Sequence, residues 1–176
     1  MRKLKLDELN RLSTEEFKQA EKLPLIIVLD NIRSAANIGS VFRTCDAFLI
    51  EAIYLVGICA VPPNRDIQKS ALGATETVSW TYFETIKEAI AALRAEHCEI
   101  ITIEQSDKST MLQDFQPEKD KKYALIFGNE VEGVSDFAIQ YCDTCIEIPQ
   151  FGMKHSLNIS VSAGMVIWDF VCKLRL

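Results

Sequence analysis

The sequence predicts an α/β fold with a mainly parallel, six-stranded sheet and helices on both faces. Apolar segments of strand length alternate with helix-length segments through most of the chain, a pattern typical of parallel strands joined by helical crossovers. Residues 25–29 (LIIVL) are apolar at every position, which indicates a strand buried on both faces. At 176 residues the chain fits one domain, residues 1–176, with a short helical extension over residues 1–23.

The expected elements follow in chain order. The six strands cover residues 25–29, 52–57, 78–83, 99–104, 123–127 and 145–149. Leucines at helical spacing predict an N-terminal helix over residues 7–21, in which Ser13–Glu16 marks either a cap or a break. Further helices are expected after residue 37, within 61–74, over 85–97, and in the very apolar segment that ends the chain. Residues 105–122 are polar and predict a loop.

Ile38, Val41, Phe42 and Cys45 recur at the spacing of one helical face. That face is expected to pack on the sheet, so Arg43 points away from it. A solvated surface arginine is one explanation of Arg43, and a ligand-facing one is the other.

The composition is that of a soluble globular protein, with 48% hydrophobic and 25% charged residues. No apolar run is long enough to span a bilayer, and the basic N-terminus lacks the apolar core of a signal peptide, so we expect a cytoplasmic protein without membrane contact. The net charge of −6 argues against a protein that holds nucleic acid by overall positive charge. A local basic patch is still compatible with that balance.

The six cysteines fit a reducing compartment. Cys45, Cys59 and Cys98 lie in apolar segments, where a free thiol packs as a small hydrophobic group. Cys142 and Cys145 have the spacing of a metal or redox pair, but no second pair accompanies them, so we predict no metal site.

Three separate segments bring polar groups to the position just after a predicted strand. They are residues 37–43 (NIGSVFR), 126–133 (IFGNEVEG) and 148–164 (IPQFGMKHSLNISVSAG). Each has an ordinary structural explanation alone, such as a tight glycine turn or a helix cap from Ser156 or Asn158. The carboxyl ends of parallel strands meet at one edge of a sheet, however, where ligands bind in open α/β folds. The chain contains neither G-x-G-x-x-G nor G-x-x-x-x-G-K-[ST], so a dinucleotide fold or a P-loop is not supported.

Together the three segments closely resemble the signature motifs of the SpoU/TrmH branch of the SPOUT superfamily, the RNA ribose 2′-O-methyltransferases. Residues 71–74 (ALGA) are also similar to that family, and the resemblance covers about residues 24–172. It implies a sheet whose C-terminal third forms a trefoil knot, S-adenosylmethionine as cofactor, RNA as substrate, and a homodimer with active sites near its interface. The apolar final helix agrees with burial on more than one side.

The resemblance also implies roles for individual residues. The expected cofactor contacts are Thr102, Ile103, Gly128, Ile148, Met153 and Leu157. The expected catalytic residues are Arg43, Asn37, Glu130, Ser156 and Asn158. Arg43 matches an arginine proposed in the family as a base. Because a guanidinium is not normally deprotonated in proteins, electrostatic steering of a phosphate is the more conservative role.

The clustered cations expected to contact RNA are Arg33, Arg65, Lys69 and Lys154, besides Arg43. Only residues 1–23 precede the first strand, so the chain resembles a compact member of the family, and compact members often act on tRNA. We therefore favour tRNA over rRNA as the substrate. The alternatives are an rRNA 2′-O-methyltransferase, a catalytically inactive RNA-binding module of the same fold, or an enzyme that methylates a base nitrogen.

Overall fold

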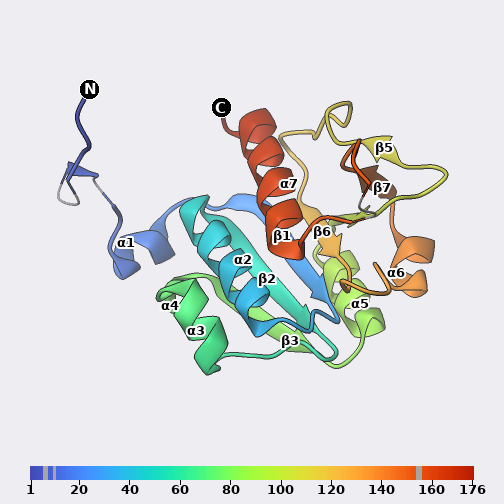
Figure 1. Ribbon diagram of the computed structural model, residues 1–176, viewed down its shortest axis with the longest axis horizontal. Coiled ribbons are helices and arrows are strands. Elements are labelled where there is room, and N and C mark those ends of the chain that lie inside the picture. The colour runs from blue at the N-terminus through green and yellow to red at the C-terminus, as the bar shows by residue number, and fades with distance from the viewer. Residues whose placement is uncertain (6–7, 10, 154–155) are drawn as a thin grey trace.

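A computed structural model describes residues 1–5, 8–9, 11–153 and 156–176. Its centre is a seven-stranded sheet in the order β3-β2-β1-β6-β4-β7-β5, in which every neighbouring pair of strands is parallel (Figure 1). The strands are β1 (Leu23–Asp30), β2 (Ile50–Val56), β3 (Ser79–Phe83), β4 (Glu99–Ile103), β5 (Thr110–Met111), β6 (Tyr123–Phe127) and β7 (Thr144–Glu147). The predicted α/β class and parallel sheet are confirmed.

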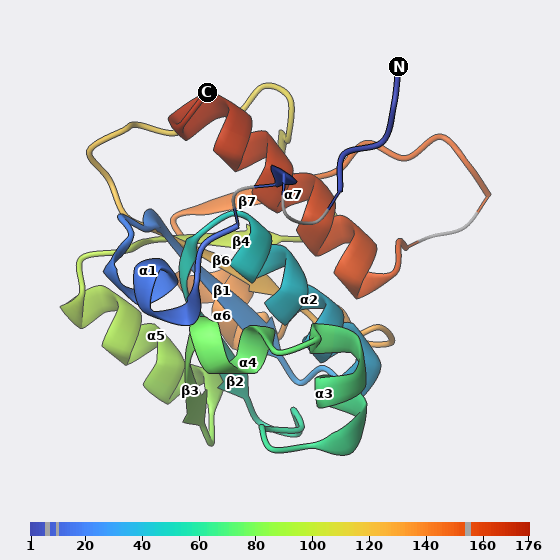
Figure 2. The same ribbon diagram turned by 90° about the vertical axis from the view of Figure 1, so that its left-hand side faces the viewer.

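Helices cover both faces of the sheet, as Figures 1 and 2 show. They are α1 (Thr14–Gln19), α2 (Ala35–Ala47), α3 (Arg65–Ala71), α4 (Ala74–Thr77), α5 (Ile86–Ala95), α6 (Asp136–Tyr141) and α7 (Ile159–Leu174). One apolar core joins the sheet to α2, α3 and α7, and a second core joins the opposite face to α5 and α6.

Strand β1 contributes alternate side chains to the two cores. It lies between β2 and β6, so its apolar residues are buried on both sides of the sheet. Leu25 and Ile27 belong to the core under α2 and α7, whereas Ile26 and Val28 belong to the core under α5 and α6. This alternation follows from the two-residue repeat of a strand.

The predicted count of six strands is wrong, because the described residues form seven. The additional strand is β5, which has only two residues and pairs with β7 at the sheet edge. It lies inside the polar segment 105–122 that the sequence predicts as a loop, and a two-residue strand leaves no periodic pattern to detect. Helix α6, which has six residues and lies between β6 and β7, was not predicted either.

The N-terminal helix is shorter than predicted. It begins only at Thr14, because Ser13 caps it and Glu16 completes a capping box. Ser13–Glu16 is therefore a cap, and Leu9 and Leu12 lie before the helix with exposed side chains. Residues 7 and 10 of the predicted helix, and residue 6 before it, lie outside the described residues.

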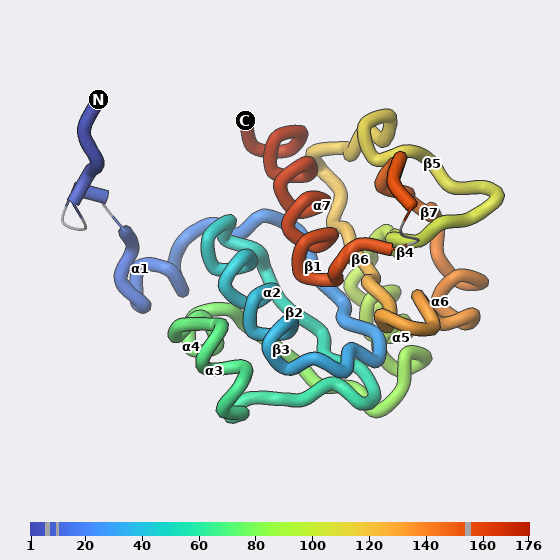
Figure 3. The backbone as a smooth tube through the Cα atoms, in the orientation of Figure 1, coloured from blue at the N-terminus to red at the C-terminus, as the bar shows by residue number. Residues whose placement is uncertain are grey.

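The C-terminal half has an unusual path, which Figure 3 traces in yellow and red. The chain leaves β4, pairs through β5 at the far edge, and returns to β6 in the interior of the sheet. Strand β7 then enters between β4 and β5. Helix α7 packs against the returning segment, where Phe170 stacks on Phe115 with ring centroids 5.7 Å apart and Lys173 donates to the Leu112 and Phe115 carbonyls, each at 2.8 Å.

Within the described part of the chain, no helix combines the length and the apolar character needed to cross a membrane.

Candidate active site

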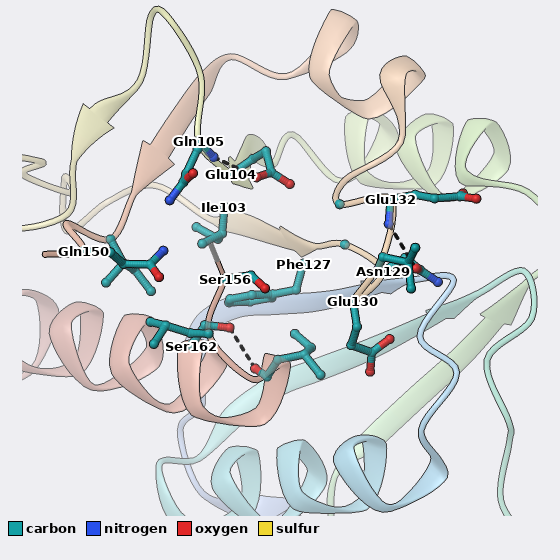
Figure 4. Close-up of a pocket in the computed structure, with 16 residues that line it drawn as sticks. Ile103, Glu104, Gln105, Phe127, Asn129, Glu130, Glu132, Gln150, Ser156 and Ser162 are labelled. Carbon is teal, nitrogen blue, oxygen red and sulfur yellow. Dashed lines mark hydrogen bonds between the residues drawn. The ribbon is translucent and has the colours of Figure 1, made fainter. Parts of the chain in front are cut away.

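A cavity of about 370 Å³ opens at the carboxyl ends of β4 and β6, beside the segment that follows β7 (Figure 4). It lies at the sheet edge where the sequence predicts a site. Its lining residues are Ile103, Glu104, Gln105, Phe127, Gly128, Asn129, Glu130, Val131, Glu132, Gly133, Ile148, Gln150, Ser156, Leu157, Ile159 and Ser162. The apolar lining residues provide a surface for a flat, apolar group, and the polar residues provide hydrogen-bond partners.

The loop after β6 is folded back on itself. The Asn129 and Gly133 backbones exchange two hydrogen bonds of 2.9 Å. A side chain at Gly128 would overlap the backbone of Gly133 and Val134, so only glycine permits this close approach. The loop therefore exposes backbone directly to the cavity.

Asn129 holds this loop in place and is itself 7% exposed. Its Oδ1 accepts hydrogen bonds from the Val131 and Glu132 amides at 2.8 and 3.2 Å. Its Nδ2 donates to the Asn31 carbonyl at 2.7 Å, which ties the loop to the turn after β1. The next residue, Glu130, is then directed toward α2.

Three distant segments are joined by side-chain hydrogen bonds at this edge. Asn37 Nδ2, in the first turn of α2, donates to Glu130 Oε1 at 3.2 Å. Asn158 Nδ2 donates to Asn37 Oδ1 at 3.3 Å. Asn158 is also the N-cap of α7, where its Oδ1 accepts from the Ser160 amide at 2.9 Å. The cap explanation of Asn158 is therefore confirmed, and the same side chain also contacts Asn37.

Arg43 lies on the same helix as Asn37, six residues or about 9 Å further along the axis. The buried residues of α2 are those that the sequence places on the core face, including Ile38 and Phe42. Arg43 itself is exposed and lies outside the cavity lining. Arg43 therefore belongs to the surface of α2 and makes no described hydrogen bond to Asn37, Glu130 or Asn158.

The expected cofactor residues divide into two groups. Ile103, Gly128, Ile148 and Leu157 line the cavity, as does Ser156 from the catalytic group. Thr102 is fully buried on the opposite face of β4, and its hydroxyl donates to Cys142 Sγ at 3.4 Å. Met153 is 85% exposed and lies outside the lining.

Among the expected RNA contacts, Arg33 is exposed after β1, and Arg65 and Lys69 are exposed on α3. Helix α3 packs on α2 through Gly39, where a side chain would overlap Ile67 and Ser70. Lys154 lies outside the described residues.

The sequence reasoning did not single out Glu104, Gln105 or Gln150, all of which line the cavity. A signal was available, because Glu104 ends a predicted strand, Gln105 follows it directly, and strand ends form this edge. It also missed Asp30, a buried carboxylate that accepts from Asn31 Nδ2 at 2.9 Å and from the Ser135 amide at 3.0 Å.

Comparison with known proteins gives one family. The profile of the SpoU rRNA Methylase family matches residues 24–168. The 23S rRNA (guanosine-2′-O-)-methyltransferase RlmB of Neisseria meningitidis serogroup B is 32% identical over 144 residues, which cover 82% of this chain and 56% of that protein. The tRNA (guanosine(18)-2′-O)-methyltransferase TARBP1 of Mus musculus is 32% identical over 152 residues, 83% of this chain but 9% of that protein. The chain thus spans about half of the first relative and a small part of the second.

Solved structures share the fold. The AdoMet-bound rRNA methyltransferase from Sinorhizobium meliloti superposes with a TM-score of 0.81 at 22% identity, covering 91% of this chain and 61% of that one. The A. aeolicus TrmH/SpoU tRNA modifying enzyme gives 0.78 at 24% identity, with coverage of 91% and 79%. The resemblance seen in the sequence is confirmed: this chain belongs to the SpoU rRNA methylase family.

Proposed function

We propose that this protein is an S-adenosylmethionine-dependent RNA ribose 2′-O-methyltransferase. The observation that carries the proposal is the hydrogen-bonded chain Glu130–Asn37–Asn158, which joins all three motif segments at the rim of the cavity. Two relatives that are each 32% identical carry names that describe guanosine 2′-O-methylation of 23S rRNA and of tRNA.

The cavity fits the proposed cofactor in size and chemistry. Its volume of about 370 Å³ is within the range of small-molecule sites. Ile103, Phe127, Ile148 and Leu157 provide apolar surface for an adenine ring, while the folded loop from Gly128 onward exposes its backbone. The Thr102 side chain does not reach the cavity, because it faces the core under α5 and α6. Thr102 can therefore contribute to cofactor binding only through its backbone.

Bound in this cavity, S-adenosylmethionine supplies a methyl group on a positively charged sulfur. The chain would then have to hold a ribose 2′-hydroxyl in line with that methyl group. Because a neutral hydroxyl is a poor nucleophile, the hydroxyl must lose its proton to the surrounding solvent as the methyl group is transferred. We assign Asn37, Glu130, Ser156 and Asn158 to orienting the ribose and the loops around it. Arg43 neutralises a neighbouring RNA phosphate and stabilises the developing negative charge on oxygen.

Replacing Arg43 with Ala tests the electrostatic role. Because Arg43 lies outside the cavity lining, we expect kcat to fall at least roughly a hundredfold, while the dissociation constant for S-adenosylmethionine changes less than about threefold. Isothermal titration measures the cofactor and radiolabelled methyl transfer measures turnover. Arg43→Lys is the matched control, which keeps the charge but loses the planar donor group. An equal loss of cofactor binding in Arg43→Ala would contradict this role.

We favour tRNA as the substrate and keep rRNA as the alternative. The exposed cations Arg33, Arg65 and Lys69 lie on the same side of the fold as α2 and provide a local positive surface on an acidic protein. Incubation of tRNA and rRNA with labelled cofactor, followed by nucleoside mass spectrometry, distinguishes the two. Resistance of the adjacent phosphodiester to alkali identifies ribose methylation. A methylated base, or RNA binding without any methyl transfer, would refute the proposal.

The proposed enzyme is a homodimer that pairs through α7. Val161, Met165 and Trp168 repeat at intervals of four and three residues, so they lie on one side of α7, and Leu157 comes just before the helix. Their exposed fractions are between 38 and 51%. A stripe of large apolar side chains on a helix that also carries a wall of the cavity supports a partner subunit at that position.

Two further features belong to the proposal. The C-terminal third forms a trefoil knot, supported by the insertion of β7 between β4 and β5 and by the packing of α7 against the segment that returns from β5. The protein works in the cytoplasm, where its RNA substrates and a reducing environment for its six cysteines are found.

A further inference from the structure

Glu104 is a carboxylate at the cavity wall that the motifs of the site do not include. It follows the last residue of β4, and its side chain points toward the loop that carries Glu130 and Glu132 (Figure 4). Its backbone is fixed to β7, because its amide donates to the Ile146 carbonyl at 3.0 Å and its carbonyl accepts from Cys145 Sγ at 3.4 Å. The carboxylate is therefore mounted on the rigid part of the sheet.

The carboxylate binds the far end of the loop after β6. Glu104 Oε2 accepts from the Val134 amide at 3.0 Å, and Oε1 accepts from the amide of Gln105 at 2.8 Å. Gly133 adopts a positive φ of 73°, and a side chain at that position would overlap the Glu104 carboxylate. The backbone of the loop is thus shaped around this group, and a charged acceptor makes the stronger kind of hydrogen bond.

The loop has a second anchor at its near end. Asn129 donates to the Asn31 carbonyl at 2.7 Å and holds the turn from the other side. Glu130 lies between the two anchors and reaches Asn37 at 3.2 Å. Beyond Val134 the chain is held again, because the Ser135 amide donates to Asp30 at 3.0 Å. If the Glu104 anchor is lost, residues 130–134 keep no described side-chain hydrogen bond to the end of β4, and the direction of Glu130 is less firmly fixed.

We propose that Glu104 is a positioning residue that holds the loop of residues 128–134 so that Glu130 meets Asn37 and the loop backbone faces the cavity. The inference rests on the proposed function, because its importance for turnover depends on the loop serving methyl transfer. Glu104 acts through the loop, and no contact of its own with the RNA is required.

Glu104→Gln is the sharpest test. The amide keeps the length of the side chain but offers one oxygen to two backbone donors, so at least one hydrogen bond is lost. Glu104→Ala removes both acceptors. In that variant we expect hydrogen exchange at the Val134 amide to accelerate roughly tenfold or more, and kcat to fall roughly tenfold to a hundredfold; in Glu104→Gln the amide that exchanges faster, Val134 or Gln105, shows which bond is lost. Glu99→Gln is the matched control, since it removes a carboxylate from the other end of the same strand, where it pairs only with Lys121 at the surface at 3.1 Å.

A double-mutant cycle with Glu130→Gln separates positioning from general destabilisation. If Glu104 acts through Glu130, the double variant turns over no more slowly than the slower single variant, whereas independent effects multiply. Multiplying effects, or Val134 exchange in Glu104→Ala like that of Glu99→Gln, overturn the proposal. Hydrogen exchange needs no methyl transfer, so it tests the Glu104 anchor even if the wild-type protein modifies no RNA. Absence of RNA modification would refute the proposed function but not the contact between Glu104 and Val134.

Discussion

Replacing Asn37 with Asp tests the contact that carries the proposed site. Asn37 Nδ2 donates to Glu130 Oε1 at 3.2 Å, while its Oδ1 accepts from Asn158. Aspartate has the same shape, so it keeps the acceptor that Asn158 uses. Toward Glu130, however, it replaces a donor with a second negatively charged oxygen.

The magnitude of this change follows from the distance. Two unit charges 3.2 Å apart repel by about 5 kcal/mol at an effective dielectric constant of about 20. Glu130 is exposed, so solvent and salt reduce the repulsion to about 1–2 kcal/mol. The lost hydrogen bond adds about 1 kcal/mol. A total of about 2–3 kcal/mol lowers the melting temperature by roughly 4–12 °C for a chain of this size.

Thermal unfolding at several pH values and salt concentrations measures the effect. Below about pH 4 carboxylates take up protons, and in the variant the folded state gains more from protonation than the unfolded state does because the repulsion disappears. The stability gap between variant and wild type should therefore be largest near pH 7 and shrink as the pH falls toward 4, and it should also shrink in 1 M salt.

Asn37→Ala provides the control, because it removes both hydrogen bonds without adding charge. We expect it to lose about 1–2 kcal/mol at every pH and salt concentration. If the loss in Asn37→Asp is as independent of pH and salt as the loss in Asn37→Ala, then Asn37 and Glu130 do not face each other and the geometry argued for the site is wrong.

Three other predictions concern the loop, the helix stripe and a buried thiol. Gly128→Ala should reduce cofactor affinity at least roughly tenfold by titration, because its side chain overlaps the loop backbone; unchanged affinity would show that the loop can open freely. Trp168→Glu should give a monomer in analytical ultracentrifugation and a lower melting temperature, because Trp168 also packs on Phe48 with ring centroids 5.5 Å apart and the partner subunit is lost; a variant that stays dimeric would place the interface elsewhere. Burial raises the pKa of Cys59 to about 11, so at pH 8 only about one thiol in a thousand is ionised. Alkylation followed by mass spectrometry should therefore label Cys59 at least roughly a hundredfold faster in urea than in the native protein. Equal rates would mean that the surroundings of Cys59 are open to solvent.

The parts of the fold that the sequence predicts well are those governed by local pattern. Residues 25–29 and 123–127 are hydrophobic at every position and form the centre of the sheet, because burial on both faces disfavours polar side chains that lack a hydrogen-bond partner. Strand β5 escapes prediction for the opposite reason. Two residues pair with β7 only because the chain has already brought that edge into place.

The site shows the same division. The strand ends predict which segments meet, and the contacts among Asn37, Glu130 and Asn158 join those segments. The strand ends alone do not predict which way a single side chain points. Thr102 and Ile103 are neighbours in a strand, so a two-residue repeat sends them to opposite faces and only Ile103 reaches the cavity. The strand end could have placed Glu104 at this edge, but its contact with the Val134 amide, 30 residues away in sequence, could not be predicted from a local pattern.

The wide sequence separation of the site has a consequence for folding. Asn37 is 93 residues from Glu130 and 121 residues from Asn158 along the chain. Closing such long loops is slow, and nothing is gained from it until the sheet between them has formed. Recovery of activity after dilution from denaturant should therefore lag behind recovery of helical signal, and a partly folded chain that already looks helical would be unable to modify any substrate.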